Sequence, residues 1–224
     1  MRYYLREAFP LPFSDIHHGI IDSGIYAIKH GGLVVVVCPR GFGKTTTLVG
    51  IMVYAVFTHL LRFPAIITAT GKDSKKILSL VQNWLCYNDR FLEDYPEIVA
   101  PFFESRGSSQ RLAATTWRDT NENCAARIQL TDGLICLPDN LGYFGCRTIT
   151  GAVRGLFVVG LDGSVIRPDY SLLDDPQTRE SANSVPQTQS RIDTIDGDVA
   201  GMAGPNRAMS MFMAVTLINR SDLA

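Results

Sequence analysis

A chain of 224 residues, 46% of them hydrophobic and 19% charged, is long enough for one α/β domain with a substantial core. The formal net charge of −1 excludes a strongly basic nucleic-acid-binding protein, so any contact with DNA has to come from a local basic patch. Five cysteines without CxxC or Cys/His spacing favour free thiols over a metal site or a disulfide framework. We expect neither a signal peptide nor a membrane span, because the longest apolar run, residues 48–61, is short and contains Gly50, Thr58 and His59.

Residues 1–32 are expected to form an N-terminal arm that packs on the domain. Residues 9–13 include two prolines, which favour an extended segment. Ser14 or Asp15 can then cap a short helix.

Residues 33–47, LVVVVCPRGFGKTTT, combine a strand-forming run with a glycine turn. The apolar run with its four valines predicts a strand buried on both faces, and the residues after Lys44 suit a helix. A strand, a glycine turn, Gly-Lys-Thr and a helix make the arrangement of a phosphate-binding loop. The glycines let backbone N–H groups approach phosphate oxygens, and the helix start adds free N–H groups. Cys38 departs from the consensus, which opens with glycine.

This loop predicts a nucleotide site in preference to a plain strand-turn-helix without a ligand. Lys44 would reach the β- and γ-phosphates of ATP, and Thr45 would hold Mg²⁺ through its hydroxyl group. The N-terminal arm could then flank the adenine pocket. The nucleotide-binding residues that we predict are Pro39, Arg40, Gly41, Phe42, Gly43, Lys44, Thr45 and Thr46.

The remainder of the segment 33–111 continues the α/β pattern. Residues 65–70 read as a second strand, and residues 73–87 as a helix whose apolar residues repeat at the spacing of one buried face. Pro96 and Pro101 bracket a stretch that we expect to be irregular. It ends in residues 106–111, where a solvated loop is the first interpretation and a DNA contact the alternative.

Residues 112–169 form a region of short predicted strands, at residues 113–118, 125–130 and 134–137. Asp132-Gly133 is a strong hairpin turn signal between the last two. A glycine-arginine loop follows at residues 149–155. Residues 156–159 and 165–166 then read as a second hairpin, which we interpret as an insertion.

Residues 170–224 begin with an apolar strand that ends in two acids, Asp174 and Asp175. Beside a phosphate loop, the first acid would hold Mg²⁺ and the second would orient or deprotonate the attacking water. The alternative is a strand that ends in a polar turn, since Pro176 follows. Residues 178–191 are polar and are expected to cap a helix that runs towards Val199, and residues 209–217 form the last predicted strand. We therefore predict an α/β fold, a P-loop NTPase with a mostly parallel sheet, helices on both faces and an added β-hairpin region.

The order of these segments resembles the ATPase domain of the large terminase subunit, the DNA-packaging motor of tailed double-stranded DNA bacteriophages. The matching segments span nearly the whole chain: FPLPFSDIHH, CPRGFGKTT, IITAT, YNDRFLEDYP, TITGAVRG, YSLLDDPQTRESANS and AVTLINRSDLA.

The resemblance implies roles for individual residues. Lys44 and Thr45 would be the phosphate and Mg²⁺ residues, and Asp174 the Mg²⁺ acid. Asp175 matches the catalytic acid, which is often Glu in this family. The remaining three residues match a basic loop residue that contacts phosphate, an arginine proposed to complete a neighbour's site, and the coupling motif that senses the γ-phosphate: Arg40, Arg154 and Thr216, respectively. For each arginine, a surface salt bridge is the structural alternative.

The implied function is ATP hydrolysis that drives double-stranded viral DNA into a procapsid. The implied partners are DNA, the portal protein, the small terminase subunit and further copies of the chain in a ring, at the portal in the cytoplasm of a bacterial host. Large terminases also carry a C-terminal nuclease domain, whereas the matching segments here end with the coupling motif. We therefore expect this chain to be an isolated or truncated ATPase domain without nuclease activity. The alternatives are a P-loop switch without useful turnover and a helicase-like ATPase that acts on single strands.

Overall fold

The computed structural model describes residues 1–105, 115–118, 125–131, 133–138, 141–160, 162–204, 209–218 and 223. The main sheet has eight strands. In chain order they are β1 (Gly32–Val37), β2 (Pro64–Thr68), β3 (Thr115–Arg118), β4 (Ala125–Leu130), β5 (Leu134–Cys136), β6 (Tyr143–Thr148), β9 (Tyr170–Asp174) and β10 (Ser210–Val215).

The strands lie in the order β1-β10-β9-β2-β6-β5-β4-β3. The first five of these are parallel to one another, and β5, β4 and β3 extend the sheet by antiparallel pairing. A separate hairpin pairs β7 (Val158–Val159) with β8 (Val165–Ile166). This architecture confirms the predicted α/β fold, with its mostly parallel sheet and added β-hairpin region. The β4–β5 hairpin was predicted from the same stretch of sequence.

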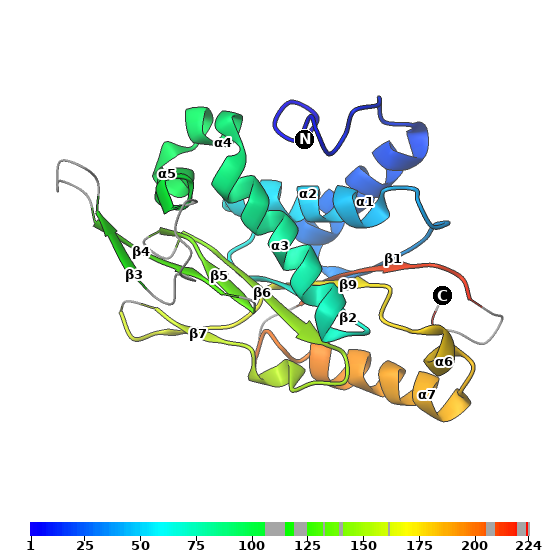
Figure 1. Cartoon of the computed structure of the whole chain (residues 1–224). Helices are drawn as coiled ribbons and strands as arrows, with labels where there is room; N and C mark the ends of the chain where they lie inside the picture. Colours follow the sequence, from blue (N-terminus) through cyan, green and yellow to red (C-terminus); the bar gives the residue numbers. More distant parts are fainter. Residues whose placement is uncertain are drawn as a thin grey trace.

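Helices cover both faces of the sheet (Figure 1). One face carries α1 (Asp15–His30), α2 (Lys44–Phe57), α3 (Gly71–Tyr87), α4 (Asp89–Asp94) and α5 (Pro96–Ser105). The other carries α6 (Arg179–Ala182), α7 (Val185–Asp193) and the short helical segments η2 (Val153–Gly155) and η3 (Thr194–Val199). None of the described helices is long and apolar enough to cross a membrane.

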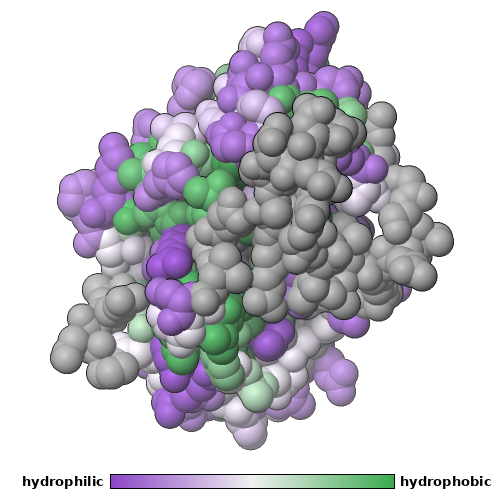
Figure 2. Space-filling view, turned by 90° about the vertical axis from the view of Figure 1, so that its left-hand side faces the viewer, coloured by the Kyte–Doolittle hydropathy of each residue, from purple (hydrophilic) through white to green (hydrophobic). Residues whose placement is uncertain are grey.

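Two apolar clusters form the core, one against each set of helices. The larger contains Leu48, Met52 and Phe212, and it includes the buried face of α3 that the apolar spacing predicted. The smaller contains Leu173 and Val199 and extends to the β7–β8 hairpin. Figure 2 shows the side of the molecule that lies at the left in Figure 1; among its described residues, hydrophobic groups are flanked by hydrophilic ones.

The prediction that the valine strand is buried on both faces is wrong. β1 lies at the edge of the sheet, where Leu33, Val35 and Val37 are 46%, 42% and 52% exposed. A run of valines suits any extended strand with apolar contacts, and the sequence carries no signal that separates an edge strand from a central one. The alternating residues Val34 and Val36 do pack against the larger cluster.

Three further differences concern the extent of the elements. The stretch expected to be irregular is the helix α5, which tolerates Pro96 at its first position and contains Pro101. The short helix expected after Ser14 has 16 residues. β6 was not predicted, because Gly145 interrupts its apolar pattern and Gly142 precedes it directly. Gly145 permits close packing, since a Cβ there would lie 2.9 Å from Leu156. The predicted loop 106–111 and the turn residue Asp132 lie outside the described residues.

The exposure of one face of β1 can be tested with two substitutions to threonine. Val35→Thr should change the free energy of unfolding by less than about 0.5 kcal/mol, because this side chain faces outward. Ile66→Thr in β2, where Ile66 is 0% exposed, should cost about 2–4 kcal/mol, because it buries a hydroxyl group and removes apolar contacts. Urea denaturation measures both values. Equal losses would mean that the outer face of β1 is covered.

Candidate functional site

The loop between β1 and α2 has the backbone of a phosphate-binding turn. Gly41 and Gly43 have φ values of 81° and 75°, in the left-handed region that favours glycine. A Cβ at Gly41 would meet nothing within 4 Å, so the turn is open to an approaching group. Cys38 is buried, has no left-handed φ, and donates its N–H to the carbonyl of Val215 at 3.1 Å. The departure from the consensus at Cys38 is therefore accommodated without strain.

Lys44, the first residue of α2, lies beside the ends of two other strands. Its Nζ donates to both carboxylate oxygens of Asp175 at 3.0 Å and to the hydroxyl group of Thr216. The Lys44 side chain is only 7% exposed, whereas that of Asp175 is 40% exposed. The fold therefore brings together three of the predicted site residues, with Lys44 131 and 172 residues from Asp175 and Thr216 in the sequence.

Thr45 and Asp174 form a second pair next to the first. The Thr45 hydroxyl donates to the two carboxylate oxygens of Asp174 at 2.8 and 2.9 Å. Burial of this carboxylate raises the pKa of Asp174 to about 6, although the hydrogen bond from Thr45 lowers it. The negative charge of Asp175 acts in the same direction as burial.

Asp175 itself has a strained backbone that its neighbours hold in place. Its φ of 40° is left-handed, which is uncommon for a residue other than glycine. Its N–H donates to the carbonyl of Ala214 at 2.8 Å, and its carboxylate accepts the N–H of Thr216, also at 2.8 Å. The bonds to β10 and the residue after it therefore fix the orientation of the Asp175 carboxylate.

A cavity of about 850 Å³ opens beside these two pairs. Arg40, Thr45, Thr46, Asp174 and Asp175 line it together with residues along α3, from Asp73 to Asn83, and at the start of α6. Two cationic residues in that lining were missed by the sequence analysis, Lys76 and Arg179. Their only sequence signal was a position soon after a predicted strand end, which many surface residues share.

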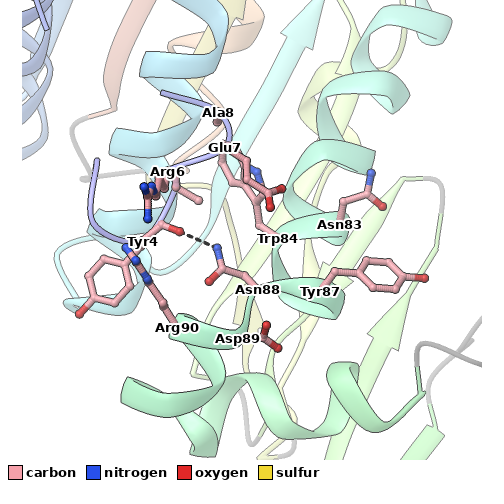
Figure 3. Close-up of a pocket in the computed structure, with 11 residues that line it drawn as sticks. Tyr4, Arg6, Glu7, Ala8, Asn83, Trp84, Tyr87, Asn88, Asp89 and Arg90 are labelled. Atoms are coloured by element: carbon pink, nitrogen blue, oxygen red, sulfur yellow. Dashed lines mark hydrogen bonds between the residues drawn. The ribbon is translucent and has the colours of Figure 1, made fainter. Parts of the chain in front are cut away.

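A second hollow, of about 410 Å³, lies between the N-terminal arm and the C-terminal half of α3 (Figure 3). Trp84, Tyr87 and Asn88 line one side, and the arm lines the other. Asn88 fastens the arm by donating from Nδ2 to the carbonyl of Tyr4 at 2.7 Å. This hollow shares Asn83 with the cavity at the phosphate loop but none of the predicted site residues.

Arg154 lies apart from the loop of its own chain. It follows β6, which is four strand positions from β1, about 19 Å at the usual strand spacing. Its guanidinium donates to the carbonyl of Gly197 at 2.9 Å and pairs with Asp198 at 2.7 Å. Arg154 does not line the cavity beside Asp174 and Asp175.

The residues present fit a nucleotide with a magnesium ion. The hydroxyl of Thr45 and the carboxylate of Asp174 supply adjacent oxygen ligands, the kind that Mg²⁺ prefers. The buried ammonium of Lys44 and the open glycine turn suit a polyphosphate.

A mostly parallel sheet with a glycine turn after one strand and two acids at the carboxyl end of another defines the P-loop NTPase class of fold. No protein-family model and no curated protein sequence matches the chain. Among solved structures, it is similar to the Phi-28 gp11 DNA packaging motor, with 12% identity and a TM-score of 0.40, over 82% of this chain and 46% of that one. It is also similar to a mutant of the Thermus phage P74-26 large terminase ATPase domain, with 13% identity and a TM-score of 0.44, over 93% of this chain and 67% of that one.

The raised pKa of Asp174 predicts a pH-dependent cost to stability in the absence of metal ions. Protonated Asp174 contributes its full stabilisation below pH 3.8, which is the ordinary pKa of this carboxyl group. That stabilisation is lost as the pH rises through about 6, the pKa of Asp174 in the folded chain. Asp174→Asn should therefore raise the free energy of unfolding at pH 7 by on the order of 2–3 kcal/mol, and by much less at pH 4. Denaturation in EDTA at both pH values measures the difference. An equal gain at pH 4 and pH 7 would show that ionisation is not its source.

Proposed function

We propose that this chain binds ATP with Mg²⁺ at the loop of residues 39–46 and hydrolyses it. The observation that carries the proposal is the convergence of Lys44, Asp175 and Thr216 beside the Thr45–Asp174 pair. A phosphate-binding lysine, two oxygen ligands for a metal ion and a carboxylate aimed at the same cavity are the parts that phosphoryl transfer to water requires.

Each residue has a role that follows from its position. Thr45 and Asp174 hold Mg²⁺, which offsets charge on the phosphoryl group when it is bound. Lys44 binds the phosphates, and Arg40, which lines the cavity from the exposed side of the loop, adds positive charge there. Asp175 orients or deprotonates the attacking water, and Thr216, bonded to both Lys44 and Asp175, senses the γ-phosphate.

The biological role that we propose is DNA packaging, in which hydrolysis drives duplex DNA into a procapsid. This part of the proposal rests on the sequence resemblance to large terminases, as do the portal protein, the small subunit and the ring as partners. The chain spans 46% of the first similar structure and 67% of the second. Two measurements separate this role from the alternatives. A nucleotide switch would show no steady-state turnover of ATP. A helicase-like ATPase would be stimulated by single-stranded DNA rather than by duplex DNA.

The division of roles between the two acids predicts different phenotypes for their variants. Lys44→Ala should abolish phosphate release. Asp175→Asn should retain binding of Mg·ATP but lose turnover by roughly 10²–10⁴-fold, because water is no longer activated. Asp174→Ala should instead weaken the metal-dependent part of binding. Steady-state phosphate release and titration calorimetry with and without Mg²⁺ measure these quantities, with melting curves to establish folding. Identical behaviour of the two acid variants would contradict the division.

We also propose that Arg154 acts on the site of a neighbouring copy. Arg154→Ala and Lys44→Ala chains, each inactive alone, should then recover part of the activity when mixed. The intact loop of the first chain receives Arg154 from the second, and an arginine supplied this way contributes about 10³–10⁵ in rate. Phosphate release by mixtures at several ratios measures the recovery, under conditions where wild-type chains assemble.

Arg179→Ala is the matched control for this experiment. Arg179 lines the cavity of its own chain. Any activity that is lost in Arg179→Ala should therefore not be recovered when this variant is mixed with Lys44→Ala. An absence of recovery for Arg154→Ala in assembled mixtures would place Arg154 in a structural role, consistent with its bonds to Gly197 and Asp198.

A further inference from the structure

His17, in the first turn of α1, contacts the tip of the phosphate loop. The His17 ring is stacked on Phe42, with ring centroids 4.5 Å apart and planes 15° from parallel. Its Nε2 lies 3.1 Å from the carbonyl oxygen of Phe42. This contact joins residues 25 apart in sequence, so it fastens one helix to a loop that belongs to the next segment of the fold.

The hydrogen bonds of His17 define which ring nitrogen carries the proton. The backbone N–H of Ser14 donates to Nδ1 at 3.3 Å, and the Ser14 hydroxyl lies 2.8 Å from the same nitrogen. Nδ1 is therefore an acceptor, and Nε2 must carry the hydrogen, because the Phe42 carbonyl oxygen can only accept. Ser14 thus holds the ring in the tautomer that donates to the loop.

The helix that carries His17 is itself firmly anchored. A Cβ at Gly24 would lie 3.0 Å from Ile51, so α1 and α2 approach closely at this point. Ile20 and Ala27 of α1 are 3% and 0% exposed. His17 therefore projects from a fixed element and can hold the loop in a defined position.

The carbonyl of Phe42 belongs to the same peptide unit as the N–H of Gly43. In a trans peptide these two groups point in opposite directions, so a carbonyl held toward His17 turns the Gly43 N–H away from His17. Among the backbone hydrogen bonds of the described residues, none is donated by the Gly43 N–H. Gly43 has a φ of 75°, and glycine can adopt many other backbone angles at little cost. The loop alone therefore does not fix the direction of the Phe42–Gly43 peptide.

We propose that His17 is a positioning residue for the phosphate loop: its Nε2–H holds the Phe42–Gly43 peptide with the Gly43 N–H directed at a polyphosphate. The inference rests on the proposed function of the loop as a nucleotide site. It assigns the N-terminal helix a part in phosphate binding, separate from any contact with the adenine base.

Two substitutions separate the hydrogen bond from the ring stacking. His17→Phe keeps an aromatic ring on Phe42 but removes the donor, and His17→Gln keeps an amide donor of similar reach but removes the ring. His17→Phe should weaken binding of Mg·ATP by about 3- to 10-fold, the usual range for one lost hydrogen bond, and raise KM by a similar factor with a smaller change in kcat. His17→Gln should bind within about twofold of the wild-type chain. His18→Gln is the matched control, because His18 is the exposed neighbour of His17 and makes no contact with the loop among the described interactions.

Tripolyphosphate with Mg²⁺ provides the second probe, since it has phosphates but no base. Calorimetry should give the same 3- to 10-fold deficit for His17→Phe with tripolyphosphate as with ATP. A deficit with ATP alone would mean that the ring contacts the base, and it would overturn the positioning role. Equal losses in His17→Phe and His17→Gln that follow their melting temperatures would also overturn it, because they would indicate a structural contact only.

The same titrations separate this inference from the proposed function. If the wild-type chain binds ATP, Lys44→Ala does not, and His17→Phe shows no deficit, the inference is overturned and the proposed nucleotide site is retained. Wild-type chains that bind neither ATP nor tripolyphosphate would overturn the proposed function, and the inference with it.

Discussion

The arrangement of the site depends on one constraint, the pairing of a nearly buried ammonium group. At 7% exposure the Lys44 side chain has left most of its water, so it needs a carboxylate and further acceptors nearby. Asp175 and Thr216 meet this need, and they come from the ends of strands that lie beyond β1 in the order β1-β10-β9. The left-handed φ of Asp175, a cost on the order of 1–3 kcal/mol, is offset by the bonds that this geometry allows.

The two adjacent acids occupy different environments, and this difference is the physical basis for giving them different roles. Asp174 is turned toward a neutral hydroxyl group, and burial raises its pKa toward neutrality. Asp175 is partly exposed and is bonded to a cation and a backbone amide. A carboxylate that burial penalises and that is bonded only to a neutral hydroxyl group favours binding of a metal ion, because the metal supplies positive charge. A carboxylate held by fixed donors at a cavity wall suits the orientation of water.

Local patterns in the sequence predicted much of this, and tertiary relations account for what it missed. The glycine turn, α3 and the acid-ended strand β9 each have a signal within about fifteen residues, and the structure places them as expected. The exposure of Val35 depends on which helices cover each face of β1, and the burial of β6 depends on glycines that read as loop residues. The contact from His17 to Phe42 depends on how α1 packs on α2, which neither segment encodes alone.

The bonds of Arg154 within its own chain do not conflict with a role at a neighbouring site, because their energies are small. The Arg154 and Asp198 side chains are 65% and 43% exposed, and exposed ion pairs contribute about 0.2–1 kcal/mol. The hydrogen bond to Gly197 adds about 1 kcal/mol. A trans arginine that accelerates hydrolysis by 10³–10⁵ stabilises the transition state by about 4–7 kcal/mol. This gain exceeds the cost of release several-fold, so the contacts with Gly197 and Asp198 are compatible with the role proposed for Arg154 at a neighbouring site.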